Sequence, residues 1–87
     1  MYNYEKERPF IFTEEGQRDF LKCRDTANKL ADIAGAFTVS AAIKGLSGDS
    51  WRMLAYVDRL VELKEFRYVN QEYHTQDWVL VKIRGTA

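Results

Sequence analysis

Apolar residues recur every three or four positions in the first third of the chain, and this period predicts one long amphipathic helix. Thr13 precedes the pattern as a candidate N-cap, and Glu14 and Glu15 place negative charge at the positive end of the helix dipole. Gly35 follows the last apolar position and is expected to end the helix. The predicted buried stripe consists of Phe20, Cys23, Ala27, Leu30, Ala31 and Ala34.

The next segment predicts a brief strand that turns directly into a second helix. Residues 36–39 hold β-forming side chains and are too few for a helix. Thr38 or Ser40 can cap the following helix, which is expected to end near Lys44. Residues 45–48 contain two glycines within four positions, so a tight turn or a helix C-cap is expected there.

A third helix is predicted to run to about Lys64, with either Asp49 or Ser50 as its N-cap. Trp51 falls at the edge of its apolar stripe. The predicted stripe consists of Met53, Leu54, Val57, Leu60, Val61 and Leu63. The residues expected to face outward are Arg52, Ala55, Tyr56, Arg59 and Glu62.

The last third of the chain changes to a period of two, which predicts a β-hairpin. Residues 65–70 and 78–84 are the expected strands, and the polar residues between them are the loop. In the second strand, Val79, Val81 and Ile83 are expected on one face. The opposite face is expected to carry Trp78, Leu80 and Lys82.

Both ends of the chain are predicted to lie outside this body. Residues 1–12 are expected to form an N-terminal arm, in which 1–9 are a loosely held polar tail. Residues 10–12 are expected to be a short strand or an extended segment packed on the body. Residues 13–84 then form one domain, and residues 85–87 form a frayed C-terminal tail.

The composition is that of one small soluble globular domain. Among 87 residues, 46% are hydrophobic, and 13 basic residues balance 13 acidic ones, which excludes disorder and a strongly basic binder. No stretch reaches the ~18–20 apolar residues of a membrane span, and no signal-peptide core follows Met1. A cytoplasmic protein with no membrane partner is therefore expected.

Few side chains are candidates for chemistry. The chain has one cysteine, Cys23, and one histidine, His74, which excludes an internal disulfide and a Cys/His zinc site. Cys23 lies on the predicted apolar stripe and is expected in the core rather than as a nucleophile. His74 is expected to be a solvated loop residue, with a catalytic or ligand role as the alternative. Because no catalytic, metal or phosphate-loop motif is present, we expect no enzyme activity and no cofactor.

The order of these elements, α+β in class, resembles the winged helix-turn-helix family. The resemblance covers residues 13–83 and is strongest over residues 37–66, whose last helix ends in Leu60-Val61-Glu62-Leu63. Lys64 stands where the family usually has glycine, and the turn around residues 47–50 is about two residues longer than the commonest version. The resemblance implies three helices, a short strand before the second helix and a C-terminal β-hairpin wing.

Double-stranded DNA is the partner that the resemblance implies, as in a transcription regulator. The third helix would enter the major groove, and the wing would contact the backbone or the minor groove. Carried over by position, the DNA-contacting candidates are Lys44, Ser47, Ser50, Arg52, Tyr56, Arg59, Arg67 and His74, with Tyr73, Lys82 and Arg84 as further wing positions. The net charge is one positive over residues 44–64, zero over residues 65–87 and one negative over the first 43. This gradient is small, so any DNA contact is expected to be weak, salt-sensitive or assisted by a partner.

A protein-interaction adaptor without direct DNA binding is the alternative. A neutral surface with exposed aromatic residues suits it, and Trp51 and Tyr56 are the better candidates for exposure. Tyr68 and Trp78 are expected to close the core instead. A homodimer is one version, because small winged helices often pair through the long first helix. The candidate protein-interface residues are Phe10, Phe12, Trp51 and Tyr73.

Overall fold

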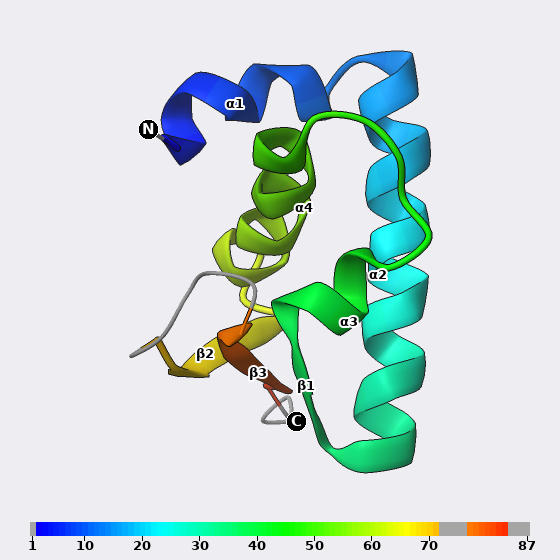
Figure 1. The fold of residues 1–87 in the computed structure, drawn as a ribbon, viewed down its shortest axis with the longest axis vertical. Helices are drawn as coiled ribbons and strands as arrows, with labels where there is room; N and C mark the ends of the chain where they lie inside the picture. Colours follow the sequence, from blue (N-terminus) through cyan, green and yellow to red (C-terminus); the bar gives the residue numbers. More distant parts are fainter. Residues whose placement is uncertain (1, 72–76, 84–87) are drawn as a thin grey trace.

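The protein is described by a computed structural model that covers residues 2–71 and 77–83. Within these residues it is an α+β fold with four helices and one three-stranded antiparallel sheet. Figure 1 shows α2 running down one side, α1 crossing the top above α4, and the sheet below α4. The elements are α1 (Tyr4–Ile11), α2 (Glu14–Ala34), β1 (Ala36–Thr38), α3 (Val39–Ile43), α4 (Ser50–Glu62), β2 (Phe66–Asn70) and β3 (Val79–Lys82).

Helix α1 replaces the predicted N-terminal arm, so the expectation of a loose tail followed by a strand or extended segment was wrong. The side chain of Asn3 caps the helix by accepting hydrogen bonds from the backbone N–H groups of Glu5 and Lys6. Ile11, in the last turn, is fully buried. The segment is mostly polar. The Asn3 cap starts the helix, and burial of the last turn of α1 holds it against the rest of the chain.

The start of α2 is fastened to the end of α1. The side chain and the backbone N–H of Thr13 both donate to the carbonyl oxygen of Phe10, and the Thr13 hydroxyl accepts from the N–H of Gly16. Gly16 is buried at this junction. A Cβ added there would lie 2.0 Å from the Phe10 oxygen, so the two helices approach as closely as they do because residue 16 has no side chain.

Helix α2 follows its prediction from cap to end. Thr13 is the N-cap, and Gly35 ends the helix at a φ of 81°, a conformation that favours glycine. Of the predicted stripe, Leu30 is only partly buried and Ala34 is exposed, because the helix outruns the core at its C-terminus. The residues of the stripe that are buried are Phe20, Cys23, Ala27 and Ala31.

The strand, second helix and turn are found where they were predicted. Thr38 caps α3 by accepting from the N–H of Ala41, and the helix ends before Lys44. The turn that follows contains Gly45 and Gly48, both at positive φ. Asp49 then caps α4, with its side chain accepting from the N–H of Trp51 at 2.8 Å.

Helix α4 is buried over a wider arc than predicted, because Val57 and Leu60 of the predicted stripe are buried together with two residues outside it. Ala55 and Tyr56, which were expected to face outward, are 0% and 2% exposed, whereas Leu63 is 40% exposed. The expectation was wrong because it allowed for one packed face. Helix α1 packs on α4 from a second direction, on the side of Ala55, and Tyr56 lies between α4 and α2.

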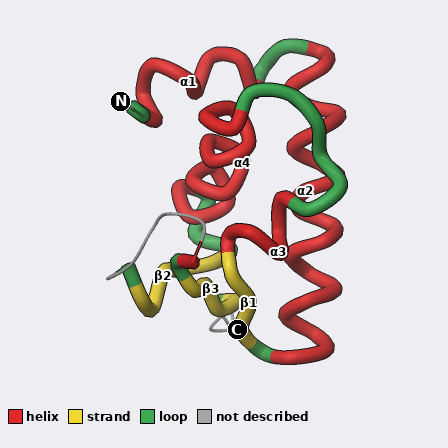
Figure 2. Tube along the Cα trace, viewed as in Figure 1, coloured by secondary structure: helices red, strands yellow, loops and turns green. Residues whose placement is uncertain are grey.

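The sheet has the order β1-β3-β2, so the last strand lies in the middle (Figure 2). Phe37 and Tyr68 both lie opposite Leu80, which is fully buried, and a bulge interrupts β2 between Tyr68 and Asn70. The predicted alternation in β3 is confirmed, because Leu80 faces the core and its neighbours Val79 and Val81 are only partly buried. The rings of Phe37 and Phe66 meet edge to face at 5.4 Å, which closes the core over the inner face of the sheet.

Cys23 is fully buried, and burial raises the pKa of its thiol to about 12. It is a core residue, as predicted. Over residues 2–71 and 77–83, no helix is both long enough and apolar enough to cross a bilayer.

Candidate nucleic-acid interface

The turn between α3 and α4 places three of the predicted DNA contacts on the surface. Lys44, Ser47 and Ser50 are all exposed. Ser50 is the first residue of α4, and free backbone N–H groups at such an end attract phosphate. Asp49 weakens this attraction, because its carboxylate occupies the N–H of Trp51 and adds a negative charge.

Arg52, in the first turn of α4, is exposed but not free. Its guanidinium carbon lies 3.8 Å from the centre of the Phe10 ring, at the end of α1. Such a cation–π contact is worth about 0.5–1 kcal/mol at an exposed site. Arg52 could still contact phosphate, but only by giving up this contact.

Arg59 is held more firmly than Arg52. Its side chain is 19% exposed and donates to Glu62 Oε1 at 2.7 Å. Its guanidinium carbon also lies 5.0 Å from the centre of the Phe12 ring. The structure therefore places this predicted DNA contact inside the packing of α1 on α4.

Tyr56 was predicted to contact DNA, and the structure contradicts this. The side chain is 2% exposed, and burial, with the nearby charges of Asp19 and Glu15, raises the pKa of its phenol to about 12. Tyr56 is a core residue between α4 and α2. It was expected to face outward because it lies off the apolar stripe that was assigned to this helix.

The wing positions fall in two groups. Arg67 is exposed on β2, and Lys82 is exposed at the end of β3. Arg67 lies opposite Val81, on the outer face of the sheet. The remaining predicted wing residues, Tyr73, His74 and Arg84, lie outside the described residues.

A polar cluster joins α1 to α4 around Glu62. Its carboxylate accepts from the hydroxyl of Tyr4 at 2.6 Å, from Nε of Arg8 at 3.0 Å and from Arg59. These three donors lower the pKa of Glu62 to about 2, the hydrogen bond from Tyr4 being the largest cause. Three donors from two helices thus converge on one carboxylate.

A second carboxylate on α4, Asp58, receives two phenols. The hydroxyls of Tyr2 and Tyr68 donate to its two oxygens, each at 2.6 Å. Burial and the adjacent carboxylate raise the pKa of both phenols, so each remains a donor at neutral pH. Asp58 therefore links the chain before α1, helix α4 and strand β2.

The sequence pattern did not predict that N-terminal residues take part in these two clusters. Tyr2, Tyr4 and Arg8 lie more than fifty positions from their partners in α4. No spacing rule connects such distant residues. The only local signal was Asn3 followed by acidic residues, which is typical of a helix start.

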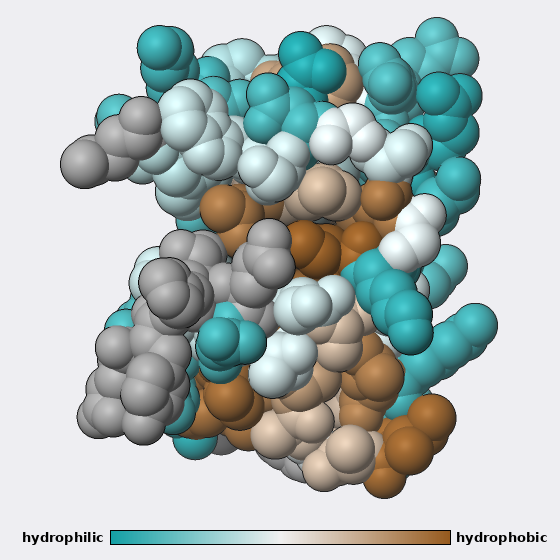
Figure 3. All heavy atoms as spheres, viewed as in Figure 1, coloured by the Kyte–Doolittle hydropathy of each residue, from teal (hydrophilic) through white to brown (hydrophobic). Residues whose placement is uncertain are grey.

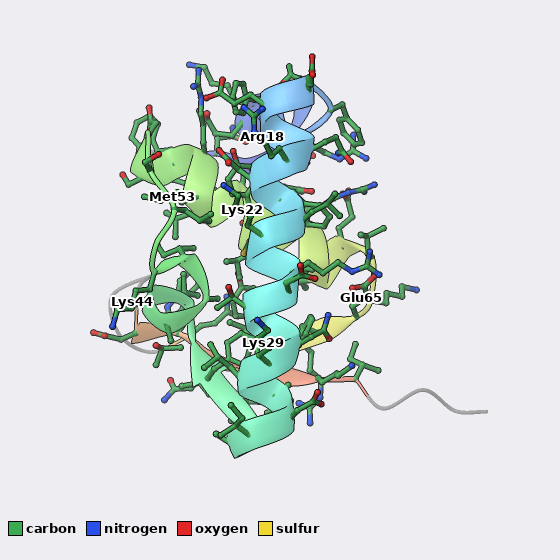
Figure 4. The ribbon with its side chains drawn as sticks, turned by 90° about the vertical axis from the view of Figure 1, so that its right-hand side faces the viewer. Arg18, Lys22, Lys29, Lys44, Met53 and Glu65 are labelled. Atoms are coloured by element: carbon green, nitrogen blue, oxygen red, sulfur yellow. The ribbon has the colours of Figure 1, made fainter. Side chains whose placement is uncertain are left out.

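The basic side chains of α2 are a further candidate for phosphate contact. Figure 4 shows Arg18, Lys22 and Lys29 along one side of α2, with Lys44 beyond α3 on the same side of the molecule. Exposed acidic residues interrupt this row on α2, among them Asp25. The side of α2 is therefore a mixed surface rather than a basic one.

The predicted protein-interface residues differ in the exposed fraction of their side chains. Phe10 is partly buried against the core, and Phe12 is 50% exposed beneath the guanidinium groups of Arg8 and Arg59. Trp51, at the start of α4, is 38% exposed. Of the three, Trp51 and Phe12 present aromatic surface to solvent.

The chain matches no protein-family model, no curated protein and no solved structure. What the candidate site can do therefore rests on the arrangement of its own residues. That arrangement leaves Lys44, Ser47 and Ser50 open to solvent. Arg52 lies over the ring of Phe10 in α1, and Arg59 lies over the ring of Phe12, the C-cap of α1.

Proposed function

We propose that this chain is a winged helix-turn-helix domain that works as a protein-interaction module and does not read duplex DNA with the side of α4. The order of α2, β1, α3, α4, β2 and β3 supports the winged-helix assignment, since it is the order that the family resemblance implies. Helix α1 is an addition to that order. It decides which surfaces of the domain remain available.

The observation that carries the proposal is the burial of Ala55. This residue is 0% exposed although it lies on the side of α4 that the apolar stripe leaves open. At 3.6 residues per turn, the buried positions Ala55, Tyr56, Val57 and Leu60 cover more than half of the circumference of α4. A helix buried in this way, with α1 packed across it, has little side surface to place in a major groove.

The charge of the surface supports the same conclusion. Binding to duplex DNA draws much of its free energy from neutralising phosphates. Here the chain has no net charge, and Arg52 and Arg59 on α4 lie over the rings of Phe10 and Phe12 at the end of α1. Large apolar side chains are exposed instead, and exposed apolar surface is typical of protein interfaces. The largest exposed fractions belong to Ile33 at 83%, Phe12 at 50%, Leu21 at 50% and Val69 at 46%.

DNA contact through the end of α4 is the second candidate function. The exposure of Lys44, Ser47 and Ser50 around the α4 N-terminus favours it. In helix-turn-helix proteins the first residues of the recognition helix are those that contact base edges. Arg52 could join them if it left Phe10.

A titration of the labelled protein with a mixed-sequence duplex, read by backbone amide shifts at low salt, tests the proposal. The interaction module predicts no saturable shifts. Shifts confined to the α3–α4 turn and lost in Lys44→Glu, but kept in the matched variant Lys6→Glu on α1, would favour the second candidate. Saturable shifts at Ala55 and Arg59 would overturn the proposal outright.

A further inference from the structure

Three large apolar side chains are exposed where α2 runs beside the end of α4. They are Phe12, Leu21 and Leu63, which are 50%, 50% and 40% exposed, and we call this surface the apolar strip. It lies at the Glu65 side of α2, and Figure 4 shows Glu65 on the opposite side of α2 from Met53 and Lys44. Figure 3 faces a different side of the molecule, where the apolar side chains lie over its middle and lower parts.

One end of the apolar strip is fixed where α1 meets α2 and α4. The centre of the Phe12 ring lies 5.0 Å from the guanidinium carbon of Arg59 on α4. Gln17 on α2 donates to the carbonyl oxygen of Ile11, the residue before Phe12, at 2.8 Å. Phe12 therefore lies beside both helices.

The other end of the apolar strip is fixed by an ion pair. Arg24 Nη2 on α2 lies 2.8 Å from Glu65 Oε2, just beyond the end of α4. Leu21 lies one helical turn before Arg24, and Leu63 lies two positions before Glu65. Leu21 and Leu63 are therefore neighbours in two rows that are joined at both ends.

The edge of the apolar strip on α4 is basic. Arg8 and Arg59 both donate to the carboxylate of Glu62. Their guanidinium carbons lie 4.9 and 5.0 Å from the centre of the Phe12 ring. Two guanidinium groups thus share one carboxylate, which leaves one positive charge at this end. Lys64 is exposed at the other end of the edge and adds a second, since it has no ion pair within the described residues.

The edge on α2 has the opposite balance. Glu14, Arg18 and Asp25 follow one another along α2 at spacings of four and seven residues, so they form one row beside Leu21. All three are exposed, and their net charge is one negative. The two edges therefore differ in charge, which distinguishes between the two orientations of a partner.

We propose that the apolar strip binds an amphipathic helix of a partner protein, with an acidic edge of that helix against Arg8, Arg59 and Lys64. The proposal rests on the proposed function, since it names the chemistry of the partner of the interaction module. Each guanidinium has five N–H donors, so Arg8 and Arg59 can bind a carboxylate of the partner while they keep Glu62.

The length of the apolar strip suits a helical partner. From Gln17 to Arg24 is two turns of α2, about 10 Å. Apolar side chains at positions i, i+3, i+4 and i+7 of a partner helix span the same length, and such side chains are the usual anchors of a helix on an apolar surface. With three large apolar side chains the contact is small, so we expect a transient complex.

Titration of the labelled protein with two synthetic peptides, read by backbone amide shifts at low salt, tests the proposal. One is a helical peptide of about 18 residues with leucine at every third or fourth position and glutamate along one edge. The other has lysine in place of glutamate. The glutamate peptide is expected to give saturable shifts at Leu21 and Leu63 below about 1 mM. The lysine peptide is expected to bind about tenfold more weakly. No saturable shifts, or equal or stronger binding of the lysine peptide, would overturn the proposal.

A pair of variants on α2 tests the position of the contact. Leu21→Glu is expected to raise the dissociation constant of the glutamate peptide about tenfold, because it places a carboxylate against an apolar and acidic surface. Ile33→Glu is the matched control, since Ile33 is 83% exposed on the same helix but outside the apolar strip. Both positions are exposed, so both variants should keep the wild-type Tm. Equal weakening by the two variants would contradict binding at the apolar strip.

A charge reversal tests the acidic edge of the partner. Lys64→Glu is expected to weaken the glutamate peptide and to strengthen the lysine peptide, whereas Lys44→Glu, on the other side of α2, should change neither. The same response to both reversals would exclude the basic edge as the cause. Failure of the peptides leaves the proposed function standing if duplex DNA gives no saturable shifts. Saturable shifts at Ala55 with duplex DNA would overturn the proposed function whether or not a peptide binds.

Discussion

The guanidinium carbon of Arg52 lies 3.8 Å from the centre of the Phe10 ring, and this contact joins the first turn of α4 to the last turn of α1. Both residues were predicted to serve outside partners, Arg52 as a DNA contact and Phe10 as a protein interface. In the folded chain they contact each other instead. The contact shows that α1 covers a side of α4 that the sequence pattern predicted to be exposed. That side is therefore not available to an outside partner in the folded chain.

Enlarging Ala55 is expected to destabilise the protein by forcing α1 away from α4. Ala55 is 0% exposed, and added methylenes in a packed site cost about 1–3 kcal/mol. Ala55→Leu should therefore lower the urea midpoint, whereas Ser50→Leu, at an exposed position of the same helix, should change stability by less than about 0.5 kcal/mol. Equal effects of the two substitutions would show that α1 does not pack on Ala55.

Gly16→Ala is expected to destabilise the protein although alanine is the better helix former. The exchange gains up to ~1 kcal/mol of helix propensity in an open helix. At this position the new Cβ would lie 2.0 Å from the backbone oxygen of Phe10, so α1 and α2 would have to separate. Thermal unfolding should show a lower Tm for Gly16→Ala and a nearly unchanged one for Lys22→Ala, an exposed site on α2. A higher Tm for Gly16→Ala would contradict this junction.

Removing the carboxylate of Asp58 is expected to cost more than removing either hydroxyl that it accepts. Asp58→Ala leaves the part-buried phenols of Tyr2 and Tyr68 without their acceptor, a loss of about 1–3 kcal/mol. Tyr2→Phe removes one hydrogen bond and should cost about 0.5–1.5 kcal/mol. Chemical denaturation compares the two, with Asp32→Ala as an exposed control. A larger loss for Tyr2→Phe than for Asp58→Ala would contradict the shared carboxylate.

The cluster around Glu62 predicts a specific loss of stability in acid. Its pKa is lowered from 4.5 to about 2 in the folded chain, so the folded state binds this proton less readily than the unfolded state. The carboxylate therefore stabilises the fold above pH 4.5, and this stabilisation is lost as the pH falls from 4.5 toward 2. Because the ion pairs are partly exposed, salt should reduce the effect.

Glu62→Gln provides the measurement for this pH dependence. Its Tm should be lower than that of the wild type at neutral pH, and the two values should converge near pH 2. Asp25→Asn removes an exposed carboxylate on α2. The difference between its Tm at neutral pH and its Tm in acid should be nearly that of the wild type. Wild-type and Glu62→Gln curves that run parallel from neutral pH to pH 2 would show that the cluster does not form.

Periodicity was enough to predict those elements that pack on one side. Thr13 and Gly35 bound α2 as expected, and Cys23 and Ala27 are buried on its stripe. The turn before α4 was predicted from its two glycines, because few other residues adopt a positive φ without strain. These are local features, and local rules are sufficient to recognise them.

The position of α1 and the second buried side of α4 were not predictable in the same way. A single stripe indicates one packed face, whereas Ala55 lies off that stripe and is buried on the side of α4 where α1 packs. The pairing of Tyr4 with Glu62 joins residues 58 positions apart, which no spacing within either helix can indicate. The candidate DNA contacts were therefore chosen on the assumption that one side of α4 is exposed. In the structure α1 covers that side.

Native-state hydrogen exchange of α1 tests most directly whether it closes the side of α4. The opening free energy measured for the amides of Arg8 and Ile11, in the second half of α1, should equal that of the amides of Val57 and Leu60 in α4. That result would mean that α1 leaves α4 only when the whole domain unfolds. Rapid exchange of the α1 amides while the α4 amides stay protected would contradict the account, because the side of α4 would then open in the folded protein.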